Sequence, residues 1–167
     1  MGAGGMAEKT EKTAGSVARV RAALLAAGHP DTILPAPAGA RTAADAAAAM
    51  GCSVARIVKS LIFRLGDAPL LVLVSGANRV DPARLAALFP TATIGRADAA
   101  FVRAATGFAI GGVAPLGHLT PPETVIDADL LALDPLFAAA GAPDYLFRTN
   151  ADALCRITGG RVAELRA

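Results

Sequence analysis

Lys59 is the first candidate for chemistry in this chain of 167 residues, because it could bind a ligand or exchange a proton. The sequence has thirteen arginines but three lysines, and the other two, Lys9 and Lys12, lie in a polar N-terminal stretch. Lys59 stands instead within the apolar run 57–62. A partly buried ammonium on a flexible stem titrates or binds where a guanidinium does not fit. The alternative is a lysine that leaves the end of a strand and keeps its head in water.

A glycine-rich loop is the second candidate for chemistry. It has the pattern G-x-x-x-P, and its residues are Gly111, Gly112, Val113, Ala114 and Pro115. Paired glycines allow a backbone to approach a ligand closely, and exposed amides in such a turn hold an anion or a carbonyl oxygen. Many loops of this composition are only turns, so the pattern by itself leaves both interpretations open.

Several familiar kinds of site are not encoded. The sequence has no G-x-S-x-G or H-E-x-x-H motif, and its two histidines, His29 and His118, are far apart. Cys52 and Cys155 are also isolated, which argues against a zinc site and a disulfide framework and fits a reducing cytoplasm. We therefore expect no metal, no cofactor and a cytoplasmic location.

The composition predicts one domain with its own core. Residues 1–15 are small and polar, so we expect a disordered leader followed by a single domain at 16–167. A net charge of +2 is too small to hold polyanions by bulk field, and neither a membrane nor DNA is expected as a partner. The longest uncharged stretch, 104–122, has four glycines and three prolines, which disfavours a membrane helix.

Local signals predict the elements that must position these residues. Helices are expected after five capping residues: Ser16, Thr42, Asp81, Asp98 and Asn150. Strands are expected at 60–65, 70–74, 108–110, 125–130, 145–149 and 161–165. Helices and strands interleave irregularly, with tight hairpins. The order favours a mixed α/β fold, with a central, mixed, barrel-like β-sheet and peripheral helices.

Three motifs, in their order and spacing, resemble the YbaK/prolyl-tRNA synthetase-associated editing domain family. They are V-K-S-L-I-F-R at 58–64, S-G-A-N-R at 75–79 and G-G-V-A-P-L-G-H at 111–118, and the resemblance covers about residues 16–167. It implies a cleft between the lysine strand and the G-x-x-x-P loop. It also implies hydrolysis of the ester that joins an amino acid to the terminal adenosine of tRNA.

The resemblance assigns roles to both candidates. Lys59 would contact a phosphate or polar group of the substrate, and amides near Gly112 would hold the ester carbonyl or its oxyanion. A ribose hydroxyl of the substrate would assist the attacking water. The rest of the loop would bind substrate: Gly111, Val113, Ala114 and Pro115.

Four further residues have two interpretations each. Thr42 is a helix cap or a residue at the mouth of the cleft. Ser75 and Asn78, with Arg79, line the pocket or only form a turn. His118 hydrogen-bonds substrate or ends the loop.

The expected partner is the acceptor end of an aminoacyl-tRNA, and a synthetase is a further candidate. Arg41, Arg79 and Arg103 are candidates for tRNA contact. Our first choice of substrate is tRNA-Pro carrying alanine, with cysteine or another small amino acid as alternatives, and a monomer or weak homodimer is the default. Two other functions stay open: a nucleic-acid-binding module without catalysis, and a non-catalytic partner that docks on a synthetase or ribosomal factor.

Overall fold

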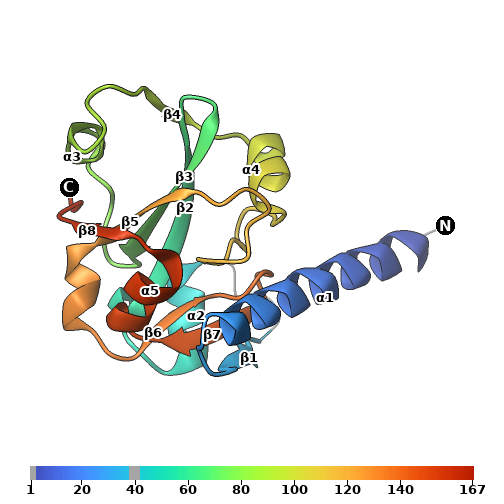
Figure 1. The fold of residues 1–167 in the computed structure, drawn as a ribbon. Coiled ribbons are helices and arrows are strands. Elements are labelled where there is room, and N and C mark those ends of the chain that lie inside the picture. The colour runs from blue at the N-terminus through green and yellow to red at the C-terminus, as the bar shows by residue number, and fades with distance from the viewer. Residues whose placement is uncertain (1–2, 38–41) are drawn as a thin grey trace.

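The protein folds around one mixed sheet of eight strands, with five α-helices at its periphery (Figure 1). The structure, a computed structural model, describes the backbone of residues 3–37 and 42–167 and, within these ranges, the side chains from Ala14 onward. The predicted mixed α/β fold with peripheral helices is confirmed. In the described residues, the end strands of the sheet, β1 and β8, do not pair with each other, so the sheet stays open.

The elements follow one another in this order: α1 (Ala3–Ala26), β1 (Ile33–Pro35), α2 (Ala43–Met50), a 3₁₀ turn (Val54–Arg56), β2 (Ile57–Leu65), β3 (Ala68–Ser75), α3 (Pro82–Ala87), β4 (Ile94–Arg96), α4 (Ala99–Thr106), β5 (Glu123–Asp127), a second 3₁₀ turn (Ala128–Ala132), β6 (Leu136–Ala139), β7 (Tyr145–Thr149), α5 (Ala151–Thr158) and β8 (Arg161–Ala163).

Four of the five predicted helix starts are confirmed, because their capping side chains accept backbone hydrogen bonds as expected. The Thr42 hydroxyl accepts from the Asp45 amide at 3.1 Å, and the Asp45 carboxylate accepts in return from the Thr42 amide. Asp81, Asp98 and Asn150 cap α3, α4 and α5 in the same way.

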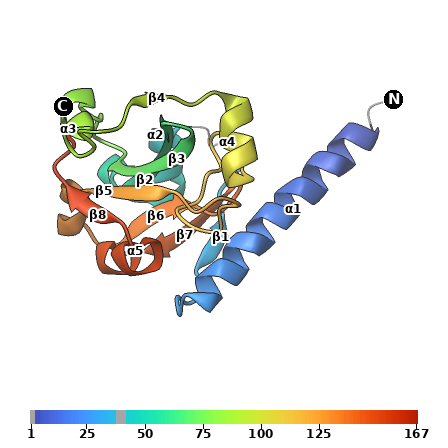
Figure 2. The ribbon, with the colours of Figure 1, turned by 45° about the horizontal axis from the view of Figure 1, so that its top comes forward.

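Helix α1 differs from the expectation. Its backbone is helical from Ala3, so Ser16 lies inside the helix and does not cap it. Alanine, glutamate and lysine are good helix formers, which accounts for the continuation into the segment that we expected to lack fixed structure. The N-terminal half of α1 extends away from the body of the protein (Figure 2). The division into a leader and a domain remains a prediction.

Strand β2 is the centre of the sheet and has three neighbours. It pairs antiparallel with β3 from Val58 to Leu65. Its other edge pairs with β6 at Ile57 and Val58 and with β4 from Phe63 to Leu65. Among the described residues, the four positions between, 59–62, have no strand partner on that edge.

The strand predictions were partly wrong. Segment 108–110 is not a strand, because Phe108 turns into the core and Ile110 begins a turn that exposes its own side chain. The strand predicted at 125–130 ends at Asp127, where that carboxylate caps a 3₁₀ turn. Strands β1, β4 and β6 were not predicted; they have only three or four residues each, too few for a clear alternation of polar and apolar residues.

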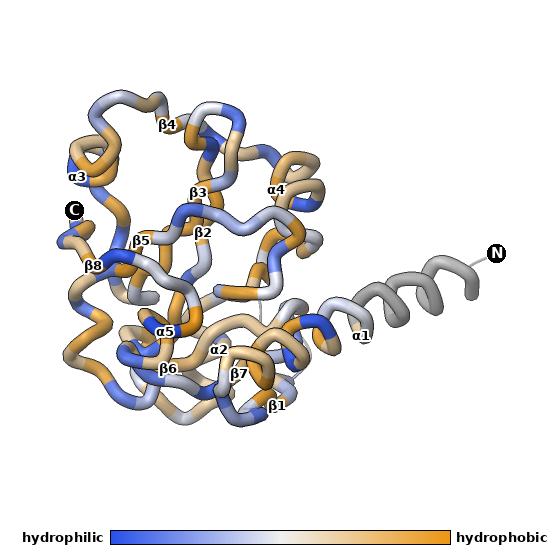
Figure 3. Tube along the Cα trace, in the orientation of Figure 1, coloured by the Kyte–Doolittle hydropathy of each residue, from blue (hydrophilic) through white to orange (hydrophobic). Residues whose placement is uncertain are grey.

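The main buried cluster joins the sheet to α1, α4 and α5. The central strands are mostly hydrophobic (Figure 3), and Leu71 and Leu73 of β3 are fully buried. Val20 and Leu24 of α1 join the same cluster together with Phe147 of β7. This packing holds the C-terminal half of α1 against the body, and burial of these side chains is the main stabilising contribution of the helix.

Two adjacent leucines of α1 test this packing. Leu24 is completely buried, whereas Leu25 is 56% exposed. Leu24→Ala should lower the free energy of unfolding by about 2–5 kcal/mol, because it leaves a cavity in the core. Leu25→Ala, the matched control on the same helix, should change it by less than about 0.5 kcal/mol. Urea denaturation measures both; equal losses would show that α1 does not pack as described.

Candidate active site

Lys59 and the glycine-rich loop line one cavity of about 330 Å³, as expected. Lys59 enters it from β2, Gly111 and Val113 come from the loop, and Thr42 stands at the start of α2. Small and aliphatic residues supply much of the remaining wall: Ala43, Ala46, Ile57, Ala139, Pro143 and Leu146. Segments from four parts of the chain thus meet at one cavity.

A backbone carbonyl holds the Lys59 side chain in place. Its Nζ donates a hydrogen bond to the Asn78 carbonyl oxygen at 2.5 Å. Asn78 follows β3, which pairs with β2 along its length, so the hairpin brings the two residues together. The motifs at 58–64 and 75–79 therefore lie side by side, and Asn78 contributes its main chain to their contact.

Two carboxylates hold the side chain of Asn78 in place by hydrogen bonds. Its Nδ2 donates to Oδ2 of Asp127 at 2.9 Å and to Oδ2 of Asp129 at 2.7 Å. Asp127 is 1% exposed, and its Oδ2 also accepts from the Ser75 amide at 3.2 Å. Asp127 was not among the residues predicted from the sequence. Its signal in the sequence is its place directly after the apolar residues Val125 and Ile126, because a charged residue at the end of a buried strand is stable only when polar groups surround it.

The pKa of Lys59 is lowered from its ordinary value. Partial burial is the largest cause, because it disfavours the charged ammonium, and the guanidinium of Arg79 adds like-charge repulsion. The carboxylate of Asp127 opposes both and favours the charged form. An ammonium in this position, with a carbonyl partner and a lowered pKa, is suited to bind an anionic or carbonyl oxygen.

Tight packing determines the shape of the loop. Gly111 has a φ of 92°, in the left-handed region that favours glycine. A Cβ on Gly112 would lie 2.8 Å from the Cα of Ala142, so only glycine fits there. The Gly112 amide donates to the Ala109 carbonyl at 3.0 Å and is occupied in a turn, contrary to the role that we expected for it.

Other amides of the loop are available. In the part of the chain that the structure describes, the amides of Gly111 and Val113 donate to no protein acceptor. Both residues line the cavity, whereas Ala114 and Pro115 are buried and lie outside its lining. The amides that could meet a ligand are therefore those on either side of Gly112.

His118 contacts the loop without lining the cavity. Its Nε2 donates to the Ala114 carbonyl at 2.5 Å, and its ring lies edge-on to Phe108 at 5.4 Å. Burial, the largest cause, lowers the pKa of His118; the Ala114 carbonyl opposes this and Arg19 adds to it. The ring is not part of the cavity lining. This geometry favours the structural interpretation of His118.

Some of the remaining predicted residues line the cavity and others do not. Thr42 both caps α2 and lines the cavity. Ser75 is 2% exposed, and its hydroxyl donates to the Ala55 carbonyl at 2.7 Å, so it forms the turn and does not line the cavity. Arg79 is exposed near Lys59, Arg103 is exposed on α4, and Arg41 lies outside the described residues.

Among the residues that the structure describes, no group of three or more His, Cys, Asp and Glu side chains is placed to hold a metal ion. No described helix is long and apolar enough to cross a membrane.

Comparison with known proteins gives a consistent picture. The family model of the aminoacyl-tRNA editing domain matches residues 37–157. A crystal structure of a proposed trans-editing enzyme for prolyl tRNA synthetase is 42% identical and superposes with a TM-score of 0.87, covering 91% of this chain and 97% of that one.

Two curated proteins share part of the sequence. The uncharacterized protein YwhH of Bacillus subtilis (strain 168) is 34% identical over 60% of this chain, and the match spans 64% of its own length. Proline--tRNA ligase of Lactobacillus helveticus (strain DPC 4571) is 29% identical over 55% of this chain, but the match spans only 16% of the ligase.

The Lys59 environment predicts a measurable titration. The three lysines give three ¹³Cε signals in NMR, and Lys59→Arg identifies the one that belongs to Lys59. Its pKa should lie below the ordinary value of about 10.4. Arg79→Ala should raise that pKa, because it removes a repelling charge. An unchanged or lower pKa in this variant would contradict the electrostatic description.

The packing of Gly112 predicts a strong effect of one methyl group. Gly112→Ala should displace the loop from Ala142 and lower stability by about 1–3 kcal/mol through overpacking. Gly15→Ala is the control, since a Cβ there meets nothing within 4 Å. Thermal denaturation measures both; a Gly112→Ala protein as stable as the control would refute the close approach.

Proposed function

The chain belongs to the aminoacyl-tRNA editing domain family, and we propose that it is an aminoacyl-tRNA deacylase that removes a wrong amino acid from tRNA. The proposal rests on one observation: Lys59 lines the same cavity as Gly111 and Val113, whose amides are unpaired among the described residues. An ammonium and unpaired amides are the groups that stabilise a developing oxyanion.

The reaction suits these groups. An aminoacyl ester is already activated, so holding a water in place and stabilising the tetrahedral intermediate provide much of the rate without a covalent nucleophile. Water adds to the ester carbonyl carbon, with a ribose hydroxyl of the substrate assisting. The bond between the carbonyl carbon and the ribose oxygen then breaks, and that oxygen takes up the proton that the water loses. The products are a free amino acid and a tRNA with its terminal hydroxyl restored.

Each candidate residue has a distinct role in this proposal. The Lys59 ammonium binds an oxygen of the substrate, at the carbonyl or at the terminal phosphate. The amide of Val113, with that of Gly111, donates to the oxyanion. Asn78 and Asp127 do not contact substrate; they are positioning residues that hold Lys59. Gly112 keeps the loop against Ala142.

The size and walls of the cavity favour a small amino acid as the group that is removed. Its walls contain three alanines, and its volume is about 330 Å³. Such a pocket distinguishes side chains that differ by one methylene by only about 1–3 kcal/mol. The chain is similar to a proline--tRNA ligase and to a proposed trans-editing enzyme for prolyl tRNA synthetase. Our first choice of substrate is therefore tRNA-Pro carrying alanine, followed by tRNA-Pro carrying cysteine or another small amino acid.

The proposed partner is the acceptor end of aminoacyl-tRNA, which the exposed Arg79, whose charge acts on Lys59, would help to bind. A synthetase could deliver it. The proposed setting is the cytoplasm, where tRNA is charged.

Lys59→Ala tests the proposal directly. The variant should fold, because Lys59 is only partly buried, and its deacylation rate should fall by at least about a hundredfold, the usual loss when one oxyanion donor is removed. Purified protein is incubated with tRNA-Pro carrying alanine, cysteine, serine or threonine, and the release of amino acid is measured. Arg156→Ala, an exposed change on α5, is the control and should keep full activity.

The same assay, together with a measurement of tRNA binding by the purified protein, separates the alternative functions. Binding of tRNA without hydrolysis of any ester would favour a nucleic-acid-binding module, and neither binding nor hydrolysis would favour a docking partner. Full activity of Lys59→Ala would remove Lys59 from the mechanism.

A further inference from the structure

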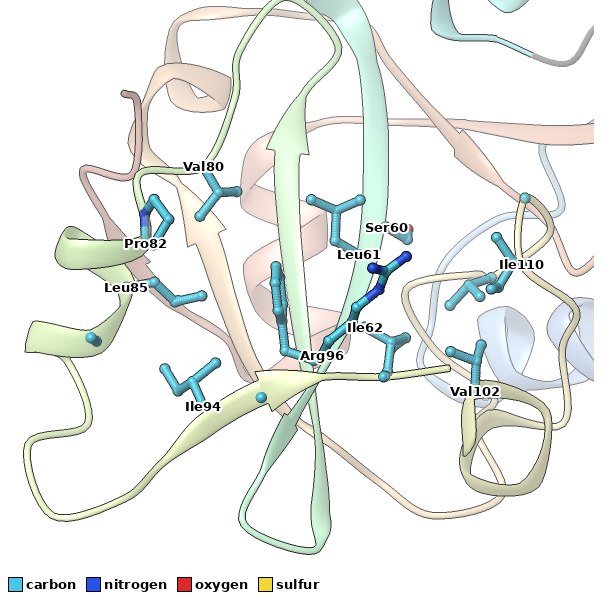
Figure 4. A pocket seen from close by; sticks show the side chains of 16 residues that line it. Ser60, Leu61, Ile62, Val80, Pro82, Leu85, Ile94, Arg96, Val102 and Ile110 are labelled. Carbon is cyan, nitrogen blue, oxygen red and sulfur yellow. The ribbon is translucent and has the colours of Figure 1, made fainter. Parts of the chain in front are cut away.

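A second, larger cavity adjoins the first. Its volume is about 670 Å³, and it shares five lining residues with the Lys59 cavity: Ser60, Leu61, Ile110, Gly111 and Val113. Figure 4 shows its walls, with Val80, Pro82, Leu85 and Ile94 on one side and Ser60, Ile62, Val102 and Ile110 on the other. A ligand could therefore occupy both cavities at once.

The open edge of β2 lies in this second cavity. Alternate residues of a strand direct their backbone groups to opposite edges. The Ile57 carbonyl accepts from Gly76 on the β3 side, and the Gly66 amide donates to Thr93 on the β4 side. Odd-numbered residues therefore face β3, and the even-numbered Ser60 and Ile62 face the edge that has no strand partner in the described residues.

Unpaired backbone groups beside apolar walls need a hydrogen-bonding partner. The unpaired segment of four residues spans about 13 Å at the rise of a strand, and β6 and β4 close it at its two ends. A peptide strand that paired here could not continue past either end. A flat molecule with a donor and an acceptor side by side on one edge fits the space.

Two side chains add to the site. The Ser60 hydroxyl is buried and has no hydrogen-bond partner in the described part of the protein. Arg96, an exposed residue of β4, lines the same cavity, and its side chain extends toward Ser60 in Figure 4. A guanidinium plane stacks favourably on a nucleic-acid base.

We propose that the open edge of β2 binds the adenine of the terminal adenosine of tRNA, an inference that rests on the proposed function. The Ser60 carbonyl accepts a hydrogen bond from the 6-amino group, and the Ile62 amide donates to N1. Arg96 stacks on the base, and the apolar residues Leu61, Val102 and Ile110 surround it.

This placement agrees with the site of ester hydrolysis. Ser60 directly follows Lys59, and Gly111 and Val113 line both cavities. A nucleoside with its base in the larger cavity places its ribose at the boundary and its aminoacyl group in the smaller cavity. An aliphatic side chain in the larger cavity would instead leave the backbone groups of Ser60 and Ile62 unpaired.

Hypoxanthine tests the site, because it carries a donor at N1 and an acceptor at position 6, the reverse of adenine. Adenosine 5′-monophosphate should bind about ten- to a hundredfold more tightly than inosine 5′-monophosphate, as for other paired contacts to a base edge. Calorimetry measures both affinities, and ¹⁵N NMR should show the Ile62 amide among the most shifted signals with the adenosine nucleotide. Equal affinities, or shifts confined to another face, would overturn the proposal.

Substitution of Arg96 gives a second test of the site. Arg96→Ala should weaken binding of adenosine 5′-monophosphate several-fold, whereas Arg148→Ala, an exposed change on β7, should not. Equal effects of the two variants would refute the stacking role of Arg96.

Alanyl-tRNA whose terminal adenosine is replaced by inosine separates this inference from the proposed function. Slower hydrolysis than for normal alanyl-tRNA supports the adenine site. Equal hydrolysis of both substrates would overturn the adenine site and leave the deacylase intact. Selective binding of adenosine 5′-monophosphate without hydrolysis of any aminoacyl-tRNA would overturn the deacylase and leave the base site.

Discussion

The hydrogen bond from Lys59 to the Asn78 carbonyl is the interaction on which the candidate site depends. A lysine side chain has many rotamers, and its ammonium is costly to bury. One carbonyl, held by Asn78 contacts to Asp127 and Asp129, orders the side chain and offsets part of that cost. The cation is thereby placed before a substrate arrives, so binding does not need to order it.

The opposite wall is organised by packing and not by charge. Gly112 approaches the backbone of Ala142 so closely that no side chain fits, and its amide closes a turn with Ala109. Behind the loop, Arg19 of α1 donates to the Gly117 carbonyl at 2.9 Å and lies over the Phe108 ring at 4.6 Å. The first helix thus supports a wall of the cavity that it does not itself line.

The sheet joins the two cavities because its central strand is incompletely paired. Complete pairing of β2 on both edges would bury the backbone of residues 59–62 between strands. Since β4 and β6 are short and reach only its two ends, the middle stays open beside Lys59. The same strand therefore supplies a cation, through a side chain, and free hydrogen-bonding groups, through its main chain.

The sequence by itself determined what short-range interactions decide. The Thr42–Asp45 box and the caps at Asp81, Asp98 and Asn150 depend on residues two or three positions apart, and each was predicted correctly. The common cleft of Lys59 and Gly111 was expected only from the family resemblance of the motifs that contain them.

Only the tertiary structure decided how those elements are used. Phe108 leaves the predicted strand because its ring packs between Arg19 and His118, and Gly112 is required by Ala142, thirty residues away. The burial of Asp127 depends on Asn78, 49 residues away in the chain. The open edge of β2 depends on β4 and β6, whose paired residues lie 29 to 80 positions away. Such contacts arise only when the chain closes on itself, so no local pattern of residues specifies them.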